Sequence, residues 1–167
     1  MITVTQVETP EQVQQARALI AEYRAYLRAE VDNEMEESEV PTVAALDQEL
    51  EELPGLYVPP RGCLLLAFVD GEVAGCIALL PYTPDAGEVK RLWVRPQARG
   101  RNVGRLLVET MLDRARAAGY RYVLLSTSIK MTDAQRLYRA LGFQVIEPYF
   151  DGPAAFMAQE VFMRLEL

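Results

Sequence analysis

The chain contains no histidine and only two cysteines among its 167 residues. Without an imidazole, a Ser–His–Asp or Cys–His nucleophilic mechanism is excluded. Cysteine and histidine together are too few for a four-ligand zinc site, and two cysteines cannot form a scaffold of several disulfides. Any acid–base chemistry therefore depends on carboxylates, tyrosine, lysine, water or backbone amides. We expect no metal site.

Long apolar runs are also absent, since no stretch approaches the ~20 residues of a membrane span. The first residues lack the basic start and the apolar run of a signal peptide. The net charge of −7, from 17 basic and 24 acidic residues, argues against non-specific nucleic-acid binding, which needs a basic face. We therefore expect a cytoplasmic protein without nucleic-acid or membrane partners. Cys63 and Cys76 lie in apolar runs and are expected in the core.

The length predicts one domain, residues 1–167. Hydrophobic periodicity and turn residues predict strands at 2–7, 63–69, 72–80, 88–94, 122–126, 143–147 and 161–167, with helices at 11–27, 43–53, 103–118 and 133–141. On the second helix, Val43, Leu46, Leu50 and Leu53 are spaced as one apolar face. The acidic stretch 30–39 between the first two helices is expected to be a loop or a frayed helix end.

Two local signals predict how the strands pair. The Asp70-Gly71 dipeptide is typical of a type I′ turn, so the strands that flank it are expected to be antiparallel. The strand–helix–strand unit at 88–126 predicts a right-handed crossover between parallel strands. Residues 132–135 match a capping box, with Thr132 at the N-cap and Gln135 at the third helical position. The expected fold is α/β (α+β), with a mixed sheet and helices on both faces.

The loop at 95–105 carries the clearest chemical signal. A helix that begins after it would present unpaired amides and a partial positive charge. Gly100 and Gly104 would allow a ligand close to the backbone, and four arginines surround those amides. These features favour a phosphate group, although neither a P-loop nor a GxGxxG motif is present. A basic turn with a glycine kept for packing is the alternative.

Three segments in order resemble the GCN5-related N-acetyltransferase (GNAT) family. Residues 88–96 (EVKRLWVRP) look like the family's fourth strand. Residues 99–104 (RGRNVG) look like its acyl-CoA pyrophosphate loop, and residues 133–143 (DAQRLYRALGF) look like its last helix. Asn102 stands where the family usually has glycine or alanine, and asparagine tolerates left-handed backbone. Asp133 replaces an asparagine that contacts the cofactor, and an ionised carboxylate cannot donate a hydrogen bond.

The resemblance implies a single GNAT domain whose sheet is mostly antiparallel with a central parallel strand pair. It implies transfer of the acetyl group from acetyl-CoA, with coenzyme A as product, to a primary amine of a small molecule or peptide. Tyr138 matches the family tyrosine near the CoA sulfur and is expected to be the acid, with a core tyrosine as the alternative. Glu88 matches an acidic position that serves some relatives as base, and a solvated strand edge is its alternative.

The same resemblance implies a set of cofactor-binding residues. Main-chain groups of Leu92 and Val94 are expected to pair with the pantetheine arm like an added strand. The pyrophosphate is expected at the amides of the loop, and Lys90 and Arg91 are expected at the surface. The implied cofactor-binding residues are Leu92, Val94, Arg99, Gly100, Arg101, Asn102, Val103, Gly104, Arg105 and Asp133.

The acceptor side is less defined by the sequence. The acidic run 32–37 lies in a region that walls the acceptor site in the family, and its carboxylates would attract a cationic amine. A solvated charge run is the alternative. Ser126 could line the same side. The sequence also allows a homodimer.

Two other functions remain open from the sequence. A module on the same fold could bind acyl-CoA without catalysis and serve regulation. An α/β protein could instead bind another phosphate ligand, such as a nucleotide.

Overall fold

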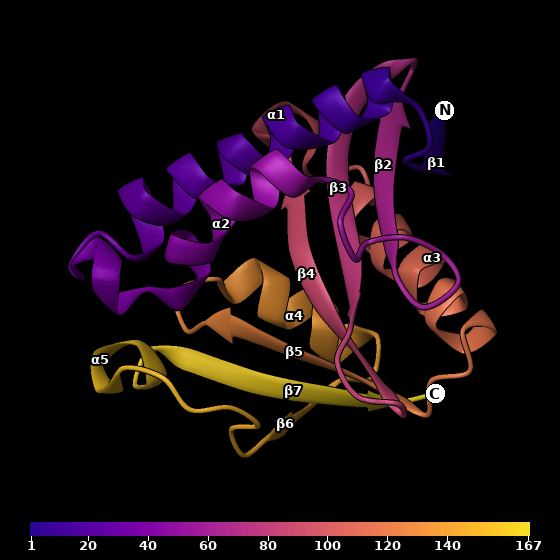
Figure 1. Cartoon of the computed structure of the whole chain (residues 1–167). Helices are drawn as coiled ribbons and strands as arrows, with labels where there is room; N and C mark the ends of the chain where they lie inside the picture. Colours follow the sequence, from indigo (N-terminus) through magenta and orange to yellow (C-terminus); the bar gives the residue numbers. More distant parts are fainter.

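The computed structural model describes the backbone of residues 1–167 and the side chains of residues 1–41 and 45–167. Within these residues, seven strands form one sheet in the order β1-β2-β3-β4-β5-β7-β6 (Figure 1). Their bounds are Ile2–Gln6 (β1), Cys63–Val69 (β2), Glu72–Pro81 (β3), Ala86–Val94 (β4), Tyr122–Ser128 (β5), Gln144–Ile146 (β6) and Glu160–Glu166 (β7). The β4–β5 pair is parallel and the other described pairs are antiparallel, which confirms the predicted mixed sheet.

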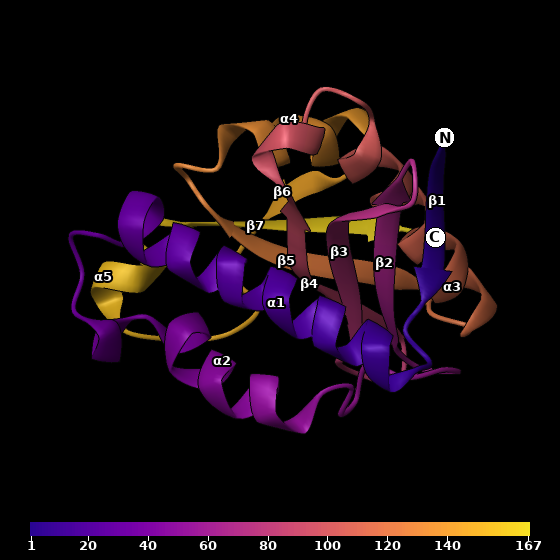
Figure 2. The same cartoon turned by 90° about the horizontal axis from the view of Figure 1, so that it is seen from above.

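Helices cover both faces of this sheet (Figure 2). Their bounds are Pro10–Tyr26 (α1), Leu27–Val31 (η1, a π-helical turn), Glu37–Glu39 (η2), Pro41–Glu52 (α2), Pro96–Ala98 (η3), Val103–Ala117 (α3), Thr132–Ala140 (α4) and Ala154–Met157 (α5). The sequence did not predict α5. The predicted place of Val43 on the apolar face of α2 lies outside the described side chains. No helix among the described residues is long and apolar enough to cross a membrane.

Alternation along the strands divides the apolar side chains between two cores. Leu65 and Ala67 of β2 face the core that α3 and α4 cover, together with Leu107, Met111 and Tyr138. Their neighbours Leu64 and Leu66 face the core beneath α1 and α2, with Leu19, Ile20 and Leu46. Cys63 and Cys76 are fully buried, one in each core, as predicted.

The hairpin between β2 and β3 has the predicted geometry. Asp70 and Gly71 both have positive φ, 50° and 88°, and the flanking residues Val69 and Glu72 pair in the ladder. A type I′ turn requires this conformation at both central positions. The dipeptide therefore adopts the turn predicted from the sequence, and Asp70 also pairs with the amino group of Met1 and with Arg101.

The capping box prediction was wrong in its location. Met131, not Thr132, is the N-cap of α4, and no side chain caps that end. The side-chain amide of Gln135 instead donates to the carbonyl oxygens of Ser128 (3.0 Å) and Ile129 (3.2 Å), and these bonds connect α4 to the end of β5. A complete capping box stands at α1, between Thr9 and Gln12.

The stretch 30–39, expected to be a loop or a frayed helix end, is loop or turn at residues 32–36, but its first two residues belong to a helical turn that continues α1. The helix continues through η1, where the backbone widens to a π-helical turn, and the N–H of Asp32 donates to the Leu27 carbonyl at 2.7 Å. Single π-helical turns within helices often occur at functional sites. The wider turn sets the direction in which the chain leaves the helix, and Asp32 is the residue that directly follows it.

Candidate functional site

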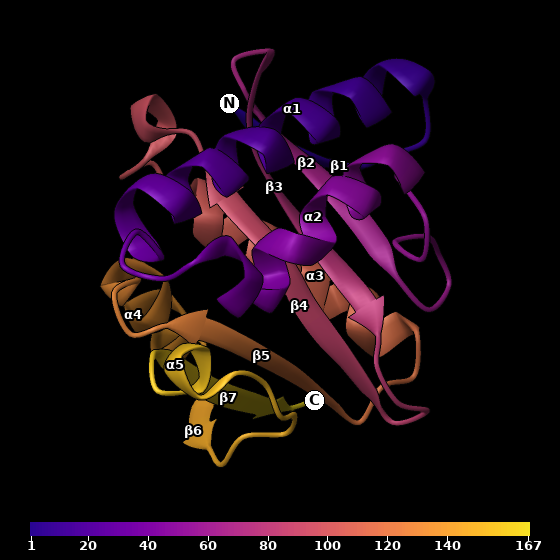
Figure 3. The ribbon, with the colours of Figure 1, turned by 60° about the vertical axis from the view of Figure 1, so that its left-hand side comes forward.

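The sheet separates between its two central strands. β4 and β5 pair only at Ala86–Glu88 with Tyr122–Leu124, while β3 follows β4 to Val94 and β7 follows β5 to Ser128. Figure 3 shows β4 and β5 close together at one end and apart at the other. The separation leaves the second half of β4 with an edge that no described strand covers.

That edge carries the main-chain groups predicted to bind the cofactor arm. The N–H of Arg95 donates to the Ala74 carbonyl of β3 at 2.8 Å. Because successive amides of a strand point to opposite sides, the N–H groups of Val94 and Leu92 face away from β3 and toward the opening. Their position favours the predicted pairing with an extended ligand.

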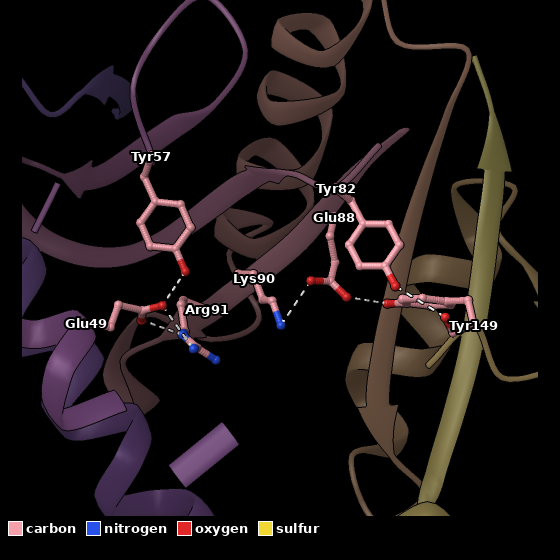
Figure 4. A network of polar contacts seen from close by, with 7 residues as sticks. All are labelled: Glu49, Tyr57, Tyr82, Glu88, Lys90, Arg91 and Tyr149. Atoms are coloured by element: carbon pink, nitrogen blue, oxygen red, sulfur yellow. Dashed lines mark hydrogen bonds and ion pairs between the residues drawn. The ribbon is translucent and has the colours of Figure 1, made fainter. Parts of the chain in front are cut away.

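A bulge in β4 redirects Arg91. The register between β3 and β4 shifts between Cys76 and Ala78, and Arg91 has φ of 59°. The residue is 6% exposed, and its side chain forms a two-pronged ion pair with Glu49 of α2, at 2.6 and 3.0 Å. Glu49 also accepts a hydrogen bond from the Tyr57 hydroxyl (Figure 4). The prediction that Arg91 lies at the surface was wrong, because the bulge turns it inward to a buried carboxylate.

Glu88 is buried, so the alternative of a solvated strand edge does not hold. Its carboxylate accepts a hydrogen bond from the Tyr149 hydroxyl at 2.6 Å and pairs with Lys90 at 3.0 Å. The Tyr82 hydroxyl donates to the Tyr149 carbonyl at 3.2 Å, which extends the network across the sheet (Figure 4). Burial and the charge of Glu88 both raise the pKa of Tyr149, so this tyrosine stays protonated.

Two adjoining hollows lie in the opening between the strands. The larger holds about 510 Å³, open to solvent, and the smaller about 340 Å³. Their walls share seven residues: Tyr23, Val89, Lys90, Arg91, Ser126, Thr127 and Met131. Glu88 does not line either one, whereas Ser126 lines both, as predicted for an acceptor-side residue.

The smaller hollow contains Tyr138, together with Leu92, Leu125 and Ala134. The Tyr138 side chain is 5% exposed and packs against Phe143, so it belongs to the core and to the hollow at once. Burial raises its pKa above the usual range of a phenol. At neutral pH the hydroxyl therefore keeps its proton and is available as a donor.

The larger hollow contains two carboxylates from separate elements. Asp32, at the end of η1, and Glu160, the first residue of β7, both line it, together with Leu27, Val31, Ser128 and Phe156. Of the acidic run 32–37, Asp32 is the buried member, whereas Glu34, Glu36 and Glu37 are exposed. The predicted acidic wall is thus reduced to one residue of that run.

Glu160 is a site residue that the sequence did not reveal, because it immediately precedes the predicted strand 161–167 and matches no motif. Burial and the nearby charge of Asp32 raise its pKa to about 8, while a hydrogen bond from Ser126 and the charge of Lys90 act in the opposite direction. Burial likewise raises the pKa of Asp32, against the charges of Arg28 and Lys130.

The loop before α3 has the backbone of an anion-binding turn. Gly100 and Asn102 both have left-handed φ, 76° and 64°, so asparagine does adopt the conformation that the loop requires. The first amide with an i−4 partner is that of Leu106, which donates to Asn102. The preceding N–H groups of α3, from Val103 to Arg105, have no partner within the helix and carry the positive end of its dipole.

The arginines of this region do not crowd around the loop as the sequence suggested. Arg95 binds Glu22 of α1 at 2.8 Å, and the Arg99 guanidinium lies over the Trp93 ring, 5.0 Å from its centroid. Arg101 and Arg105 reach Asp70 (3.4 Å) and Glu109 (2.8 Å) at the surface. Arg101 and Arg105 remain exposed enough to turn toward an anion, whereas Arg91 and Arg95 are committed to α2 and α1.

Asp133 lies on the first turn of α4, and its side chain is 94% exposed. It pairs with Arg136 on the next turn at 3.1 Å. A pair this exposed contributes little to stability. Among the predicted site residues, Asp133 therefore has the least defined contacts.

Comparison with known proteins relates the chain to one family of enzymes. The model of the family described as "Acetyltransferase (GNAT) family" matches residues 23–143. An uncharacterized N-acetyltransferase of Schizosaccharomyces pombe is 32% identical over 168 residues, which cover 99% of this chain and 95% of that protein.

Solved structures show the same fold. An acetyltransferase from Streptococcus agalactiae has a TM-score of 0.75 at 21% identity, with 99% of this chain and 98% of the other covered. A Salmonella typhimurium protein, whose structure contains its cofactor acetyl-CoA, has a TM-score of 0.67 at 18% identity, with 99% and 93% covered. At these identities the likeness concerns the fold alone.

Proposed function

Since the chain belongs to the acetyltransferase (GNAT) family and is thus an acyl-CoA-dependent N-acetyltransferase, we propose that it transfers the acetyl group of acetyl-CoA directly to a primary amine of a small molecule or peptide. The observation that carries this proposal is the opening between β4 and β5. There Tyr138, the buried carboxylate of Asp32 and the half-buried carboxylate of Glu160 line adjoining hollows beside an uncovered strand edge.

The cofactor fits this edge and the start of α3. The N–H groups of Leu92 and Val94 would pair with the pantetheine amides, and the amides of residues 99–105 would hold the pyrophosphate. Gly104 suits this role because it has no side chain between the backbone and a ligand. Arg101 and Arg105 would add charge, and Asp133 would lie at the margin of the cofactor site.

Acetyl-CoA supplies the acetyl thioester, and the residues of the chain supply proton transfers. Tyr138 holds its proton at neutral pH and would give it to the leaving sulfur. Glu88, the base predicted from the sequence, would need a water relay, because both its oxygens have partners and it lies outside the hollows. Loss of the acidic limb of the pH–rate profile in Glu88→Gln would assign the base role to Glu88, and a retained limb would place the base on another residue.

The test combines ligand binding and turnover. Acetyl-CoA at about 100 times its Kd should stabilise the native protein by ~2.7 kcal/mol, which corresponds to about 5–10 °C in Tm for this chain length. ATP and NAD should not. Release of free CoA with members of an amine panel should follow. Absence of stabilisation by acetyl-CoA would contradict the proposal, and stabilisation without CoA release would favour the non-catalytic module.

A further inference from the structure

We propose that Glu160 is the general base that takes the proton from the ammonium group of the acceptor, and that Asp32 is a positioning residue that acts through Glu160 across the hollow. The inference rests on the proposed acetyl transfer. It assigns the acceptor as an amine that arrives protonated, hence an aliphatic amine or an amino terminus rather than an aromatic amine.

The placement of the two carboxylates is the first support. They come from η1 and β7, elements far apart in the sequence, and they line the same hollow. Asp32 is only 5% exposed, and its carboxylate has no hydrogen-bond or ion-pair partner within 4.0 Å among the described side chains. A carboxylate that faces a cavity and has no ion pair of its own is suited to a cationic ligand, because a positive charge placed there is attracted to it.

The basic residues of the hollow do not satisfy these acids. Lys90 pairs with Glu88 at 3.0 Å and Arg91 pairs with Glu49 at 2.6 Å. Each cation of β4 is therefore neutralised by a carboxylate outside the hollow. The acidic groups of the hollow, Asp32 and Glu160, therefore have neither of these cations as a dedicated partner, which favours a positively charged acceptor.

The surroundings of Glu160 also suit proton transfer. The charge of Asp32 raises the pKa of Glu160, while Lys90 of β4 and the hydroxyl of Ser126 on β5 lower it. The charges of Arg28 and Lys130 lower the pKa of Asp32 in turn. Arg91 and Tyr23 also line the hollow. The resulting pKa of about 8 lies near neutral pH, where a base is most effective. Glu88, whose oxygens both have partners, lacks this exposure to the acceptor.

The transfer step balances as follows. The ammonium nitrogen gives one proton to the Glu160 carboxylate, and its freed electron pair forms the C–N bond at the thioester carbonyl carbon. When the C–S bond breaks, its electron pair leaves with sulfur, which takes the Tyr138 proton. The second nitrogen proton restores the tyrosine, and protonated Glu160 releases its proton to water. The products are the amide, free CoA and one proton.

The decisive experiment compares two probes, n-propylamine, which is protonated at neutral pH, and aniline, which is not. At pH 7, Glu160→Gln should lower kcat/KM for n-propylamine by ~10²–10⁴-fold, the usual range of general base catalysis, with a much smaller loss for aniline. Glu166→Gln, exposed on the same strand, is the control and should match the wild type. Equal losses for both amines, or no loss for n-propylamine, would overturn the proposal.

Titration provides a readout that does not require activity. The Glu160 carboxyl, followed by carbon NMR and assigned with Glu160→Gln, should titrate near pH 8 in the wild type. Asp32→Asn should lower that midpoint, because the charge of Asp32 raises it, and should move the acidic limb for n-propylamine to lower pH. A midpoint in the ordinary range of glutamate, or one that Asp32→Asn does not move, would refute the inference about Glu160. Absence of CoA release by the wild-type protein would instead contradict the proposed function.

Discussion

The buried pair of Arg91 and Glu49 is expected to be the most sensitive polar contact of the fold. Arg91 has a side chain that is 5% exposed and Glu49 one that is 19% exposed, with two hydrogen bonds between them. Glu49→Gln would leave the guanidinium buried without a counter-charge. Removal of one partner from a buried pair costs about 3–5 kcal/mol. Glutamine keeps one acceptor oxygen and the position retains some contact with water, so the lower end of that range, ~3 kcal/mol, is expected.

For a chain of 167 residues, a loss of ~3 kcal/mol corresponds to a decrease in Tm of about 6–12 °C. Urea unfolding followed by circular dichroism gives the free energy, and calorimetry gives Tm. Asp113→Asn is the matched control, because Asp113 pairs with Arg116 at the surface, where such pairs contribute ~1 kcal/mol or less. If Glu49→Gln and Asp113→Asn destabilise equally, the buried pair does not hold β4 to α2 as argued.

Three further predictions concern the site and the helix ends. Tyr138→Phe should lower kcat by about 10²-fold or more with little change in acetyl-CoA affinity from calorimetric titration; an unchanged kcat would exclude the acid role. Gly104→Ala should leave Tm near that of the wild type, because an added Cβ would meet Leu137 at 3.4 Å, but should weaken CoA binding; unaltered affinity would place the phosphates elsewhere. Thr9→Ala should lower the free energy of unfolding by ~1 kcal/mol because the N-cap is lost, whereas Thr132→Ala should change it little. A larger loss for Thr132→Ala in urea unfolding would support the capping box predicted at α4 from the sequence.

The elements of the fold were largely predictable because local patterns specify them. The Asp70-Gly71 turn requires positive φ, and the helical stripe at Val103, Leu107 and Met111 requires a core on one side. The capping signal at Thr132 failed because Gln135 finds better partners at the end of β5. Competition between local and tertiary hydrogen bonds is not readable from a motif.

The site was predictable where it consists of backbone and contiguous residues. The left-handed turns of the loop, the amides at the start of α3 and the position of Tyr138 all follow from short segments. The partners of charged side chains did not follow, because an ion pair such as Arg91 with Glu49 joins residues 42 positions apart. The four arginines expected around the loop instead contact four separate segments: α1, β4, the β2–β3 turn and α3.

The sequence by itself determined the class of fold, the family and the left-handed turns of the loop before α3, since each depends on periodicity or on a contiguous motif. Only the tertiary structure decided which acids line the larger hollow. The π-helical turn at Leu27–Val31 brings Asp32 inward, and the separation of β4 from β5 opens the space that Glu160 faces. Burial and mutual repulsion, which alter proton affinity, arise only when distant segments meet. For this reason the raised pKa of Glu160 was not apparent from the sequence.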